Sequence, residues 1–175
     1  MGTAGELSGL AVVSEGSGDK LGKVQDVLFD APSGSVTAFL VHPGGMFTKP
    51  LLLPILAVRT VGADALLVEQ GHVLEAIASD PPLPGSLSVK SLDGRPVLDD
   101  TGKYLGKMTD VTLTADSLSV ADLQYSGGVI DSMLHGKPTI PLAVVKAIGP
   151  DSIVVPASYG APQEAAEVES TQAPS

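Results

Sequence analysis

The chain has 175 residues, no Cys, and 20 acidic against ten basic side chains, which gives a net charge of −10. The lack of Cys excludes disulfides, thiolate metal sites and a cysteine nucleophile. The negative charge disfavours a basic face that binds phosphate or nucleic acid. A local basic patch stays open as an alternative, although the ten Lys and Arg are scattered along the sequence. Mean hydropathy is nevertheless positive, at +0.29, so we expect apolar surface to be left over for a partner.

The sequence pattern predicts neither an export signal nor a membrane-spanning segment. The first residues lack the basic start and apolar core of a secretory signal. The longest apolar stretch, Leu51–Val58, contains Pro54 and is far shorter than the roughly 20 residues of a membrane-spanning helix. We therefore expect a cytoplasmic protein that does not span the membrane.

Short β-strands are predicted in the first part of the chain, rich in apolar and β-branched residues and bounded by Gly, Pro, Ser or Asp. They cover residues 10–13, 21–29, 36–41, 51–54, 57–61 and 65–69. Strands of this length and spacing predict a small β-barrel or sandwich over residues 6–70.

Residues 71–87 are predicted to connect this domain to a second one. Val73–Ser79 is compatible with one or two turns of helix, and the Pro-rich Asp80–Gly85 then forms an extended spacer. The second domain covers residues 88–156. The acidic tail, residues 157–175, has little to bury and is expected to be disordered alone or extended.

An internal repeat relates the two domains. Gly18–Asp30 aligns with Gly102–Thr114, and Pro54–Val68 aligns with Pro141–Val155, in the same order along the chain. The identical pairs include Leu21/Leu105, Gly22/Gly106, Lys23/Lys107, Asp26/Asp110 and Val27/Val111. The sequence therefore predicts an all-β protein made of two tandem small β-barrels joined by a Pro-rich linker.

The two motifs Gly18–Val27 and Gly102–Val111, each followed by a β run and a closing hairpin, resemble the PRC-barrel family. The resemblance implies a small β-barrel without an active site that docks on larger assemblies. Each repeat is similar to the cytoplasmic domain of the photosynthetic reaction centre H subunit, which caps membrane-embedded subunits, and to the C-terminal domain of a ribosome maturation factor. We expect this chain to differ from both: its sequence predicts no transmembrane helix like that of the H subunit, and it carries a second PRC-like copy in place of the maturation factor's N-terminal barrel.

No pattern of residues indicates catalysis or a bound cofactor. His42, His72 and His135 lie in different segments without metal-ligand spacing. The Gly-Gly pairs lack the Gly-Lys-Ser/Thr ending of a phosphate loop. We therefore expect no catalytic residue, no metal, no cofactor and no small-molecule substrate.

Asp26 and Asp110 occupy matching places in the two copies. As a pair of carboxylates they are candidates for a proton relay near a membrane complex. The alternative is that each caps a turn or accepts backbone hydrogen bonds, which is the commoner use of Asp at such positions. We favour the second interpretation.

Bulky apolar residues follow both Gly-Gly pairs, in loops that are expected to lie at the surface. They are Met46 and Phe47 in the first copy, and Val129, Ile130, Met133 and Leu134 in the second. These side chains either form an exposed patch for a partner or fold back to plug the barrel ends. Both alternatives stay open.

The leading hypothesis is a non-catalytic scaffold that docks on the cytoplasmic face of the inner membrane. Its partners would be integral subunits of a larger complex, its own membrane contact would be peripheral, and it would bind no nucleic acid. A photosynthetic reaction centre is the favoured complex, with proton delivery to a quinone site as a secondary role. The alternative is a ribosome assembly factor that binds a basic ribosomal protein through its acidic surface.

Overall fold

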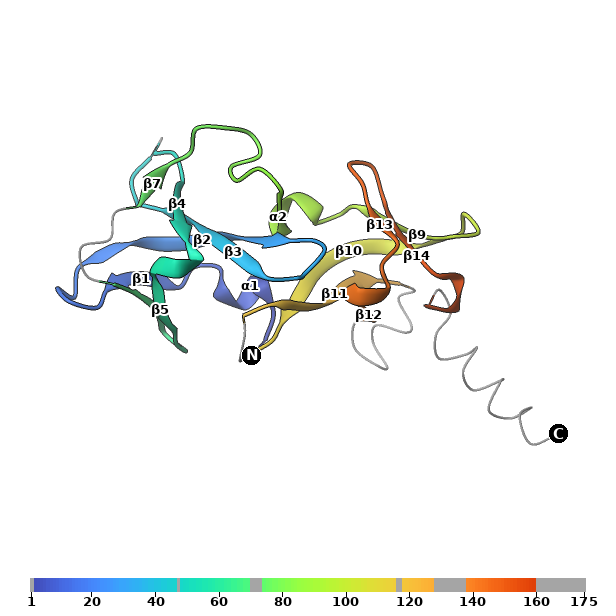
Figure 1. Cartoon of the computed structure of the whole chain (residues 1–175), viewed down its shortest axis with the longest axis horizontal. Coiled ribbons are helices and arrows are strands. Elements are labelled where there is room, and N and C mark those ends of the chain that lie inside the picture. The colour runs from blue at the N-terminus through green and yellow to red at the C-terminus, as the bar shows by residue number, and fades with distance from the viewer. Residues whose placement is uncertain (1, 47, 70–73, 116–117, 128–137, 160–175) are drawn as a thin grey trace. The chain divides into compact units, whose positions relative to one another are not determined.

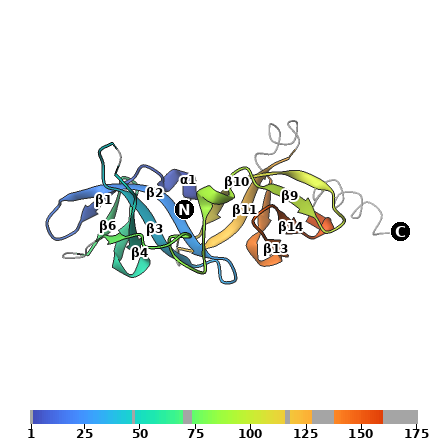
Figure 2. The ribbon, with the colours of Figure 1, turned by 90° about the horizontal axis from the view of Figure 1, so that it is seen from above.

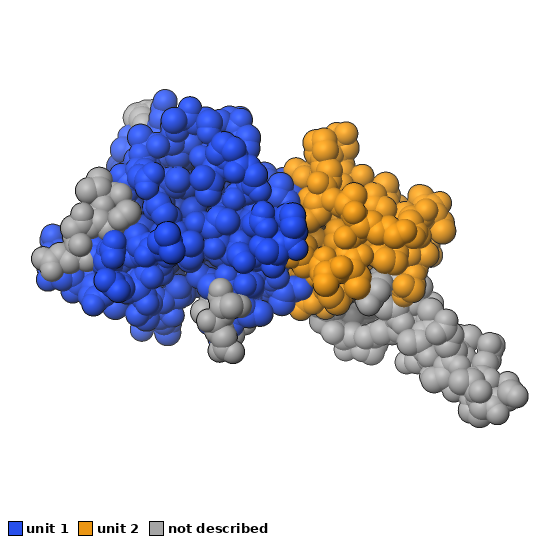
Figure 3. All heavy atoms as spheres, viewed as in Figure 1, with its two compact units in different colours: residues 1–92, 110–121 blue, residues 93–109, 122–175 orange. Residues whose placement is uncertain are grey.

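The computed structural model describes residues 2–46, 48–69, 74–115, 118–127 and 138–159. These residues form two compact units (Figure 3). Unit 1 consists of residues 1–92 and 110–121, and unit 2 consists of residues 93–109 and 122–175. Both units are built mainly from strands, which confirms the predicted all-β class.

Unit 1 is a twisted sheet with the strand order β5-β6-β1-β2-β3-β4-β7, to which β8 adds by pairing with β2 (Figure 1). Its strands are β1 (Ala11–Ser14), β2 (Lys20–Asp30), β3 (Val36–His42), β4 (Leu51–Pro54), β5 (Val58–Val61), β6 (Ala65–Val68), β7 (Glu75–Ala76) and β8 (Ser86–Ser88). All neighbours are antiparallel except β1 and β6, which run parallel. A 3-10 turn, η1 (Ile55–Ala57), turns the chain from β4 to β5.

The central strands of unit 1 are buried on both faces. Figure 2 shows β2, β3 and β4 as neighbours, and Phe29, Phe39 and Leu53 are fully buried on one face. The other face carries a cluster of Leu28, Ala38, Leu40 and Leu52, against which Ile77 and Leu83 pack. Full burial of each large apolar side chain stabilises the fold by about 1.5–3 kcal/mol, so the near-continuous apolar run of β3 fits a strand covered on both sides.

The prediction of a helix within residues 71–87 is wrong for the residues that the structure describes there. Glu75 and Ala76 form β7, which pairs with Leu52 and Leu51 of β4. One or two isolated helical turns are unstable in water, whereas the edge of β4 offers unpaired backbone groups. The Pro-rich segment is likewise no free spacer, because Leu83 packs on the sheet.

The six-stranded sheet of the second repeat has the strand order β12-β11-β10-β9-β14-β13. Its elements are β9 (Pro96–Asp99), β10 (Tyr104–Leu113), β11 (Val120–Ser126), β12 (Thr139–Pro141), η2 (Leu142–Val144), β13 (Ala147–Ile148), β14 (Ile153–Val155) and η3 (Ala157–Tyr159). The order matches β4-β3-β2-β1-β6-β5 of the first repeat, and β14 runs parallel to β9 as β6 does to β1. The internal repeat of the sequence is therefore a repeat of topology.

Each repeat begins with a helix of four residues that the sequence did not predict. These are α1 (Ala4–Leu7), before β1, and α2 (Val89–Leu92), before β9. Helices this short are not stable alone. Each buries two apolar side chains, Ala4 and Leu7 in α1 and Val89 and Leu92 in α2, so packing holds them in place.

Candidate functional site

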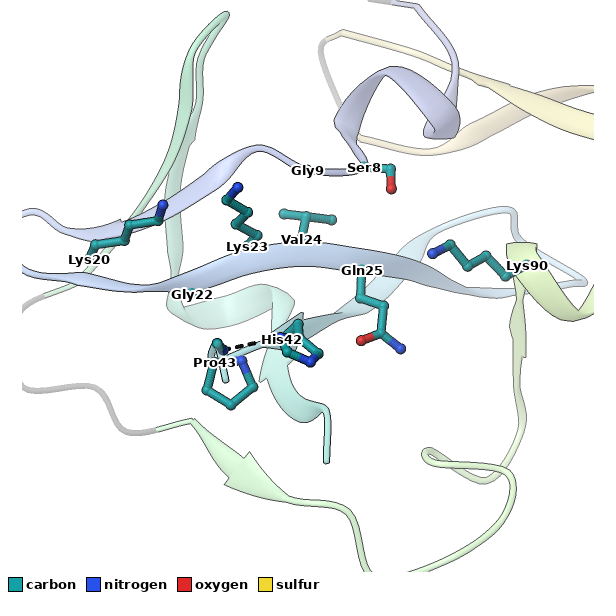
Figure 4. Close-up of a pocket in the computed structure, with 11 residues that line it drawn as sticks. Ser8, Gly9, Lys20, Gly22, Lys23, Val24, Gln25, His42, Pro43 and Lys90 are labelled. Atoms are coloured by element: carbon teal, nitrogen blue, oxygen red, sulfur yellow. Dashed lines mark hydrogen bonds between the residues drawn. The ribbon is translucent and has the colours of Figure 1, made fainter. Parts of the chain in front are cut away.

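A groove of ≈ 660 Å³ lies along β2 in unit 1 and is rich in positive charge (Figure 4). Lys20 and Lys23 line it from β2, Lys90 lines it from α2, and none of the described residues in its lining is Asp or Glu. The lining also includes Ser8 and His42. In the described part of the chain, the ion pairs involve Arg59 and Lys146 and leave these three lysines without one. The groove is therefore a local positive site on a chain of net charge −10.

A β-bulge in β2 brings Lys20 and Lys23 to one side of the strand. Val12 pairs with Gly22 and Val13 pairs with Lys20, so Leu21 is the extra residue. Residues three apart in a regular strand point to opposite faces, and one inserted residue reverses that parity. Figure 4 accordingly shows both lysine side chains rising from the same side of β2.

Gly22 is required at this bulge by a close approach of two strands. Its φ is +156°, and a side chain there would collide with the backbone carbonyl oxygen of His42 on β3. Gly106 stands in the same relation to the carbonyl oxygen of Ser126 in the second repeat. The glycine of the Leu-Gly-Lys motif is therefore a feature of the fold, set by backbone contact between strands.

The loop after β3 is shaped by His42 and Thr48. The Nδ1 atom of His42 accepts a 3.1 Å hydrogen bond from the backbone N–H of Gly44. The Thr48 hydroxyl donates to the carbonyl oxygen of Gly44 at 2.7 Å and lies 3.3 Å from Nε2 of His42. These contacts select the tautomer in which Nε2 carries the proton and donates to Thr48. His42 thus orders the wall of the groove, and both of its ring nitrogens are engaged.

Met46 lies in this loop, between His42 and Thr48, with 81% of its surface exposed. It was one of six apolar residues predicted as a partner-binding patch, and at this exposure it does not plug the barrel. The other five, Phe47, Val129, Ile130, Met133 and Leu134, lie outside the described residues.

Lys90 is held at the groove by a carboxylate from the first repeat. Asp26, which is 7% exposed, accepts a 3.1 Å hydrogen bond from the backbone N–H of Lys90 and another from the hydroxyl of Ser88. Its Oδ1 also accepts from the N–H of Val27 at 2.8 Å. The first turn of α2 is thereby fixed to β2, because the carboxylate satisfies amide donors that a helix start leaves unpaired.

Asp110 does the same for α1 with the roles of the repeats exchanged. Its carboxylate accepts from the backbone N–H of Gly5 at 3.0 and 3.2 Å and from that of Val111 at 2.7 Å. Strand pairing is exchanged in the same way. Thr3, before α1, forms a β-bridge with Thr112 on β10, and Ser88, before α2, pairs with Leu28 on β2. Both aspartates therefore accept backbone hydrogen bonds, as the second interpretation of the sequence expected.

The fold and the repeat of its bulge, glycine and aspartate match one known family. The family model for the PRC-barrel domain covers residues 2–74 and again residues 84–161. The chain belongs to the PRC-barrel family. The resemblance inferred from the two Leu-Gly-Lys motifs is thus confirmed at the level of the family. No protein with a curated description matches the chain.

The PRC-barrel repeats differ where the groove lies. Gly22, Lys23 and Asp26 recur as Gly106, Lys107 and Asp110, but Lys20 is replaced by Tyr104. His42 and Ser126 occupy equivalent places on β3 and β11, as their contacts with Gly22 and Gly106 indicate. Lys90 in α2 corresponds to Gly5 in α1, as the two carboxylate contacts show.

Sequence reasoning missed this groove because it treated the basic residues as scattered. The difference between the aligned repeats was the available signal, because Lys20 aligns with Tyr104 and is therefore specific to the first copy. In the described residues no group of His, Asp and Glu could hold a metal ion, and no helix is long and apolar enough to cross a membrane.

Proposed function

We propose that this PRC-barrel protein is a non-catalytic adaptor that docks peripherally on a membrane complex through the groove and the Met46 loop. The observation that supports it best is their continuity: Gly44 lines the groove and Met46, two residues on, is 81% exposed. A basic surface beside an exposed apolar tip suits an anionic membrane face or the headgroup-level rim of an integral protein.

The negative net charge does not oppose this docking, because electrostatic interactions in salt are local. At physiological ionic strength the Debye length is about 8 Å, so distant carboxylates are screened while groove lysines act at contact. The net charge would instead keep other faces of the protein away from an anionic surface. The groove therefore favours one orientation of unit 1.

The expected strength of the contact favours an adaptor over an autonomous membrane protein. Each lysine near an anionic membrane contributes about 1 kcal/mol, so Lys20, Lys23 and Lys90 together supply about 3 kcal/mol. Full burial of the Met46 side chain would add about 1.5–3 kcal/mol. Binding of that size is reversible, and a stable position requires a protein partner as well.

The partner in this proposal is an integral subunit on the cytoplasmic side of the inner membrane. The motif resemblance to the reaction centre H subunit makes a photosynthetic reaction centre the first complex to test. Proton delivery by Asp26 and Asp110 stays a prediction, and their backbone hydrogen bonds support a capping role.

The test is affinity capture of the tagged full chain from detergent-solubilised membranes of its own cells, with the captured proteins identified by mass spectrometry. Integral subunits are expected in the eluate of the wild type. The Met46→Ser variant is expected to capture several-fold less, and Leu56→Ala, which alters another exposed apolar side chain, is the matched control.

Capture of ribosomal proteins without integral subunits would overturn the membrane role and favour ribosome assembly. Equal capture of integral subunits by the wild type and Met46→Ser would leave the adaptor role standing, but it would remove the Met46 loop from the docking surface.

A further inference from the structure

We propose that the groove of unit 1 binds the phosphate group of an anionic phospholipid headgroup. This inference rests on the proposed function, because it names the ligand that the groove would meet at a membrane surface. It concerns Lys20, Lys23 and Lys90, whose roles the family membership leaves open.

The side chains of the groove suit a compact anion. Lys20 and Lys23 rise on the same side of β2, and the side chain of Lys90 extends toward that strand from α2 (Figure 4). Ammonium groups on flexible stems act as point charges that suit phosphate oxygens along the groove, whereas planar carboxylates are matched best by the arginine fork. The part of the lining that the structure describes contains no arginine, and Ser8 and Gln25 add uncharged donors.

The volume of the groove and the exposed Met46 side chain near it favour a lipid headgroup as the ligand. Its ≈ 660 Å³ falls within the range of about 300–1,000 Å³ that small-ligand sites occupy. The exposed Met46 follows the groove residue Gly44 and would meet the apolar layer beneath the phosphates of a bilayer. A free phosphate would leave that apolar contact unused.

A nucleic acid fits the groove less well. Binding of single strands combines a basic track with aromatic side chains on which bases stack. Among the described lining residues none is Phe, Tyr or Trp, and the ring of His42 is hydrogen-bonded within its own loop at both nitrogens. A long polyanion would also extend beyond the groove over a chain of net charge −10. A headgroup meets only the local positive site.

The groove depends on both repeats, which makes it specific to the tandem arrangement. Lys20 and Lys23 come from the first repeat, and Lys90 comes from the start of the second, fixed there by Asp26. The related position around β10 has Tyr104 where β2 has Lys20, and α1 has Gly5 where α2 has Lys90. One site per chain is therefore expected.

The experiment compares the full chain and its variants in co-sedimentation with two kinds of vesicle. One is phosphatidylcholine alone, and the other is equal parts of phosphatidylcholine and phosphatidylglycerol. The wild type is expected to bind the second kind only, and less tightly as salt rises. The triple variant Lys20→Gln, Lys23→Gln, Lys90→Gln is expected to bind about 100-fold more weakly.

Lys107→Gln is the matched control, because Lys107 holds the place of Lys23 in the second repeat and does not line the groove. It is expected to lower vesicle affinity less than about twofold, as only long-range charge changes. Far-ultraviolet circular dichroism and thermal unfolding verify that all variants fold. Equal affinity of the wild type and the triple variant for the anionic vesicles would overturn the proposal.

A titration with inorganic phosphate, followed by backbone amide shifts of Gly22, Gly44 and Lys90, separates a lipid from a free anion. Saturable shifts without vesicle binding would overturn the lipid assignment in favour of a small-anion site. Vesicle binding without capture of integral subunits would sink the proposed adaptor role and leave the lipid site standing. Capture of those subunits without vesicle binding would overturn the lipid site and leave the adaptor role standing.

Discussion

The carboxylate of Asp26 accepts a hydrogen bond from the backbone N–H of Lys90, 64 residues further along the chain, and so joins the two repeats. Asp110 and Gly5 form the reciprocal contact. Ser35 and Ser119, which hold matching places in the two copies, also form a bridge. Each repeat therefore supplies an aspartate that fixes the short first helix of the other.

Replacing Asp26 with Ala is expected to destabilise the protein by about 2–3 kcal/mol, because Ser88 and the amides of Val27 and Lys90 lose a charged acceptor. Urea unfolding followed by circular dichroism measures the loss. Asp26→Asn retains one acceptor and should lose less. Asp64→Ala, at an exposed turn, is the control and should change stability by less than about 0.5 kcal/mol. Equal stability of Asp26→Ala and the wild type would contradict the capping role.

The Gly22→Ala variant is expected to lose at least about 2 kcal/mol of stability, since its methyl group would meet the carbonyl oxygen of His42 and that backbone is held by strand pairing. Gly18→Ala is the matched control. Gly18 also has a positive φ, +75°, but has no atom within 4 Å of an added Cβ, so its loss of about 1 kcal/mol reports backbone strain alone. Both losses are measured by thermal unfolding. Similar losses in the two variants would show that the close approach of β2 and β3 does not add to the cost of a side chain at Gly22.

Acid sensitivity is expected from the turn that follows β9. The pKa of Asp99 lies below its usual value because the Thr101 hydroxyl donates to its carboxylate at 2.6 Å, with a further contribution from the N–H of Lys103. A lowered pKa in the folded state contributes stability above the ordinary carboxyl pKa of about 3.9, and this contribution disappears as the pH falls through the folded value.

The Thr101→Val variant should therefore be less stable than the wild type at neutral pH, and the difference should shrink as the pH falls from about 5 to about 3. Urea midpoints at a series of pH values measure it. Thr60→Val, an exposed site on β5, is the control and should show a difference that does not depend on pH. A constant gap for Thr101→Val would contradict the assigned cause of the pKa shift.

Truncation of Leu83 to Ala is expected to cost about 1–2 kcal/mol, because this linker side chain packs on the Leu28 cluster and is partly buried. Leu56→Ala removes the same atoms from a side chain that is 92% exposed and should change stability by less than about 0.5 kcal/mol. Chemical unfolding compares the two. If both variants match the wild type, the Pro-rich segment acts as the free spacer that its composition suggested.

The regular part of the fold could be predicted from residues close together in sequence. The predicted strands 21–29, 36–41 and 51–54 correspond to β2 (Lys20–Asp30), β3 (Val36–His42) and β4 (Leu51–Pro54). Alternation, β-branched runs and turn residues act over a few positions, so their effect can be inferred from a short window. The duplication and the family followed from the same windows, because each motif occurs twice.

Short-range patterns failed where a distant partner decides the outcome. The segment after β6 was predicted to start a helix, but Glu75 and Ala76 pair with the edge of β4. Helices α1 and α2 are too short to be stable by themselves, and they form where an aspartate of the other repeat accepts a hydrogen bond from the amide of their second residue. Local propensity holds no information about such a partner.

The sequence by itself determined the all-β class, the two repeats and the family, because these depend on local patterns that recur. Only the tertiary structure decided the groove. A bulge of one residue turned Lys20 and Lys23 to the same side of β2, and Asp26 held Lys90 beside them. Side-chain parity changes with a single inserted residue, and the position of Lys90 is set by a contact that spans 64 positions. A net charge of −10 therefore did not reveal that three lysines line one groove.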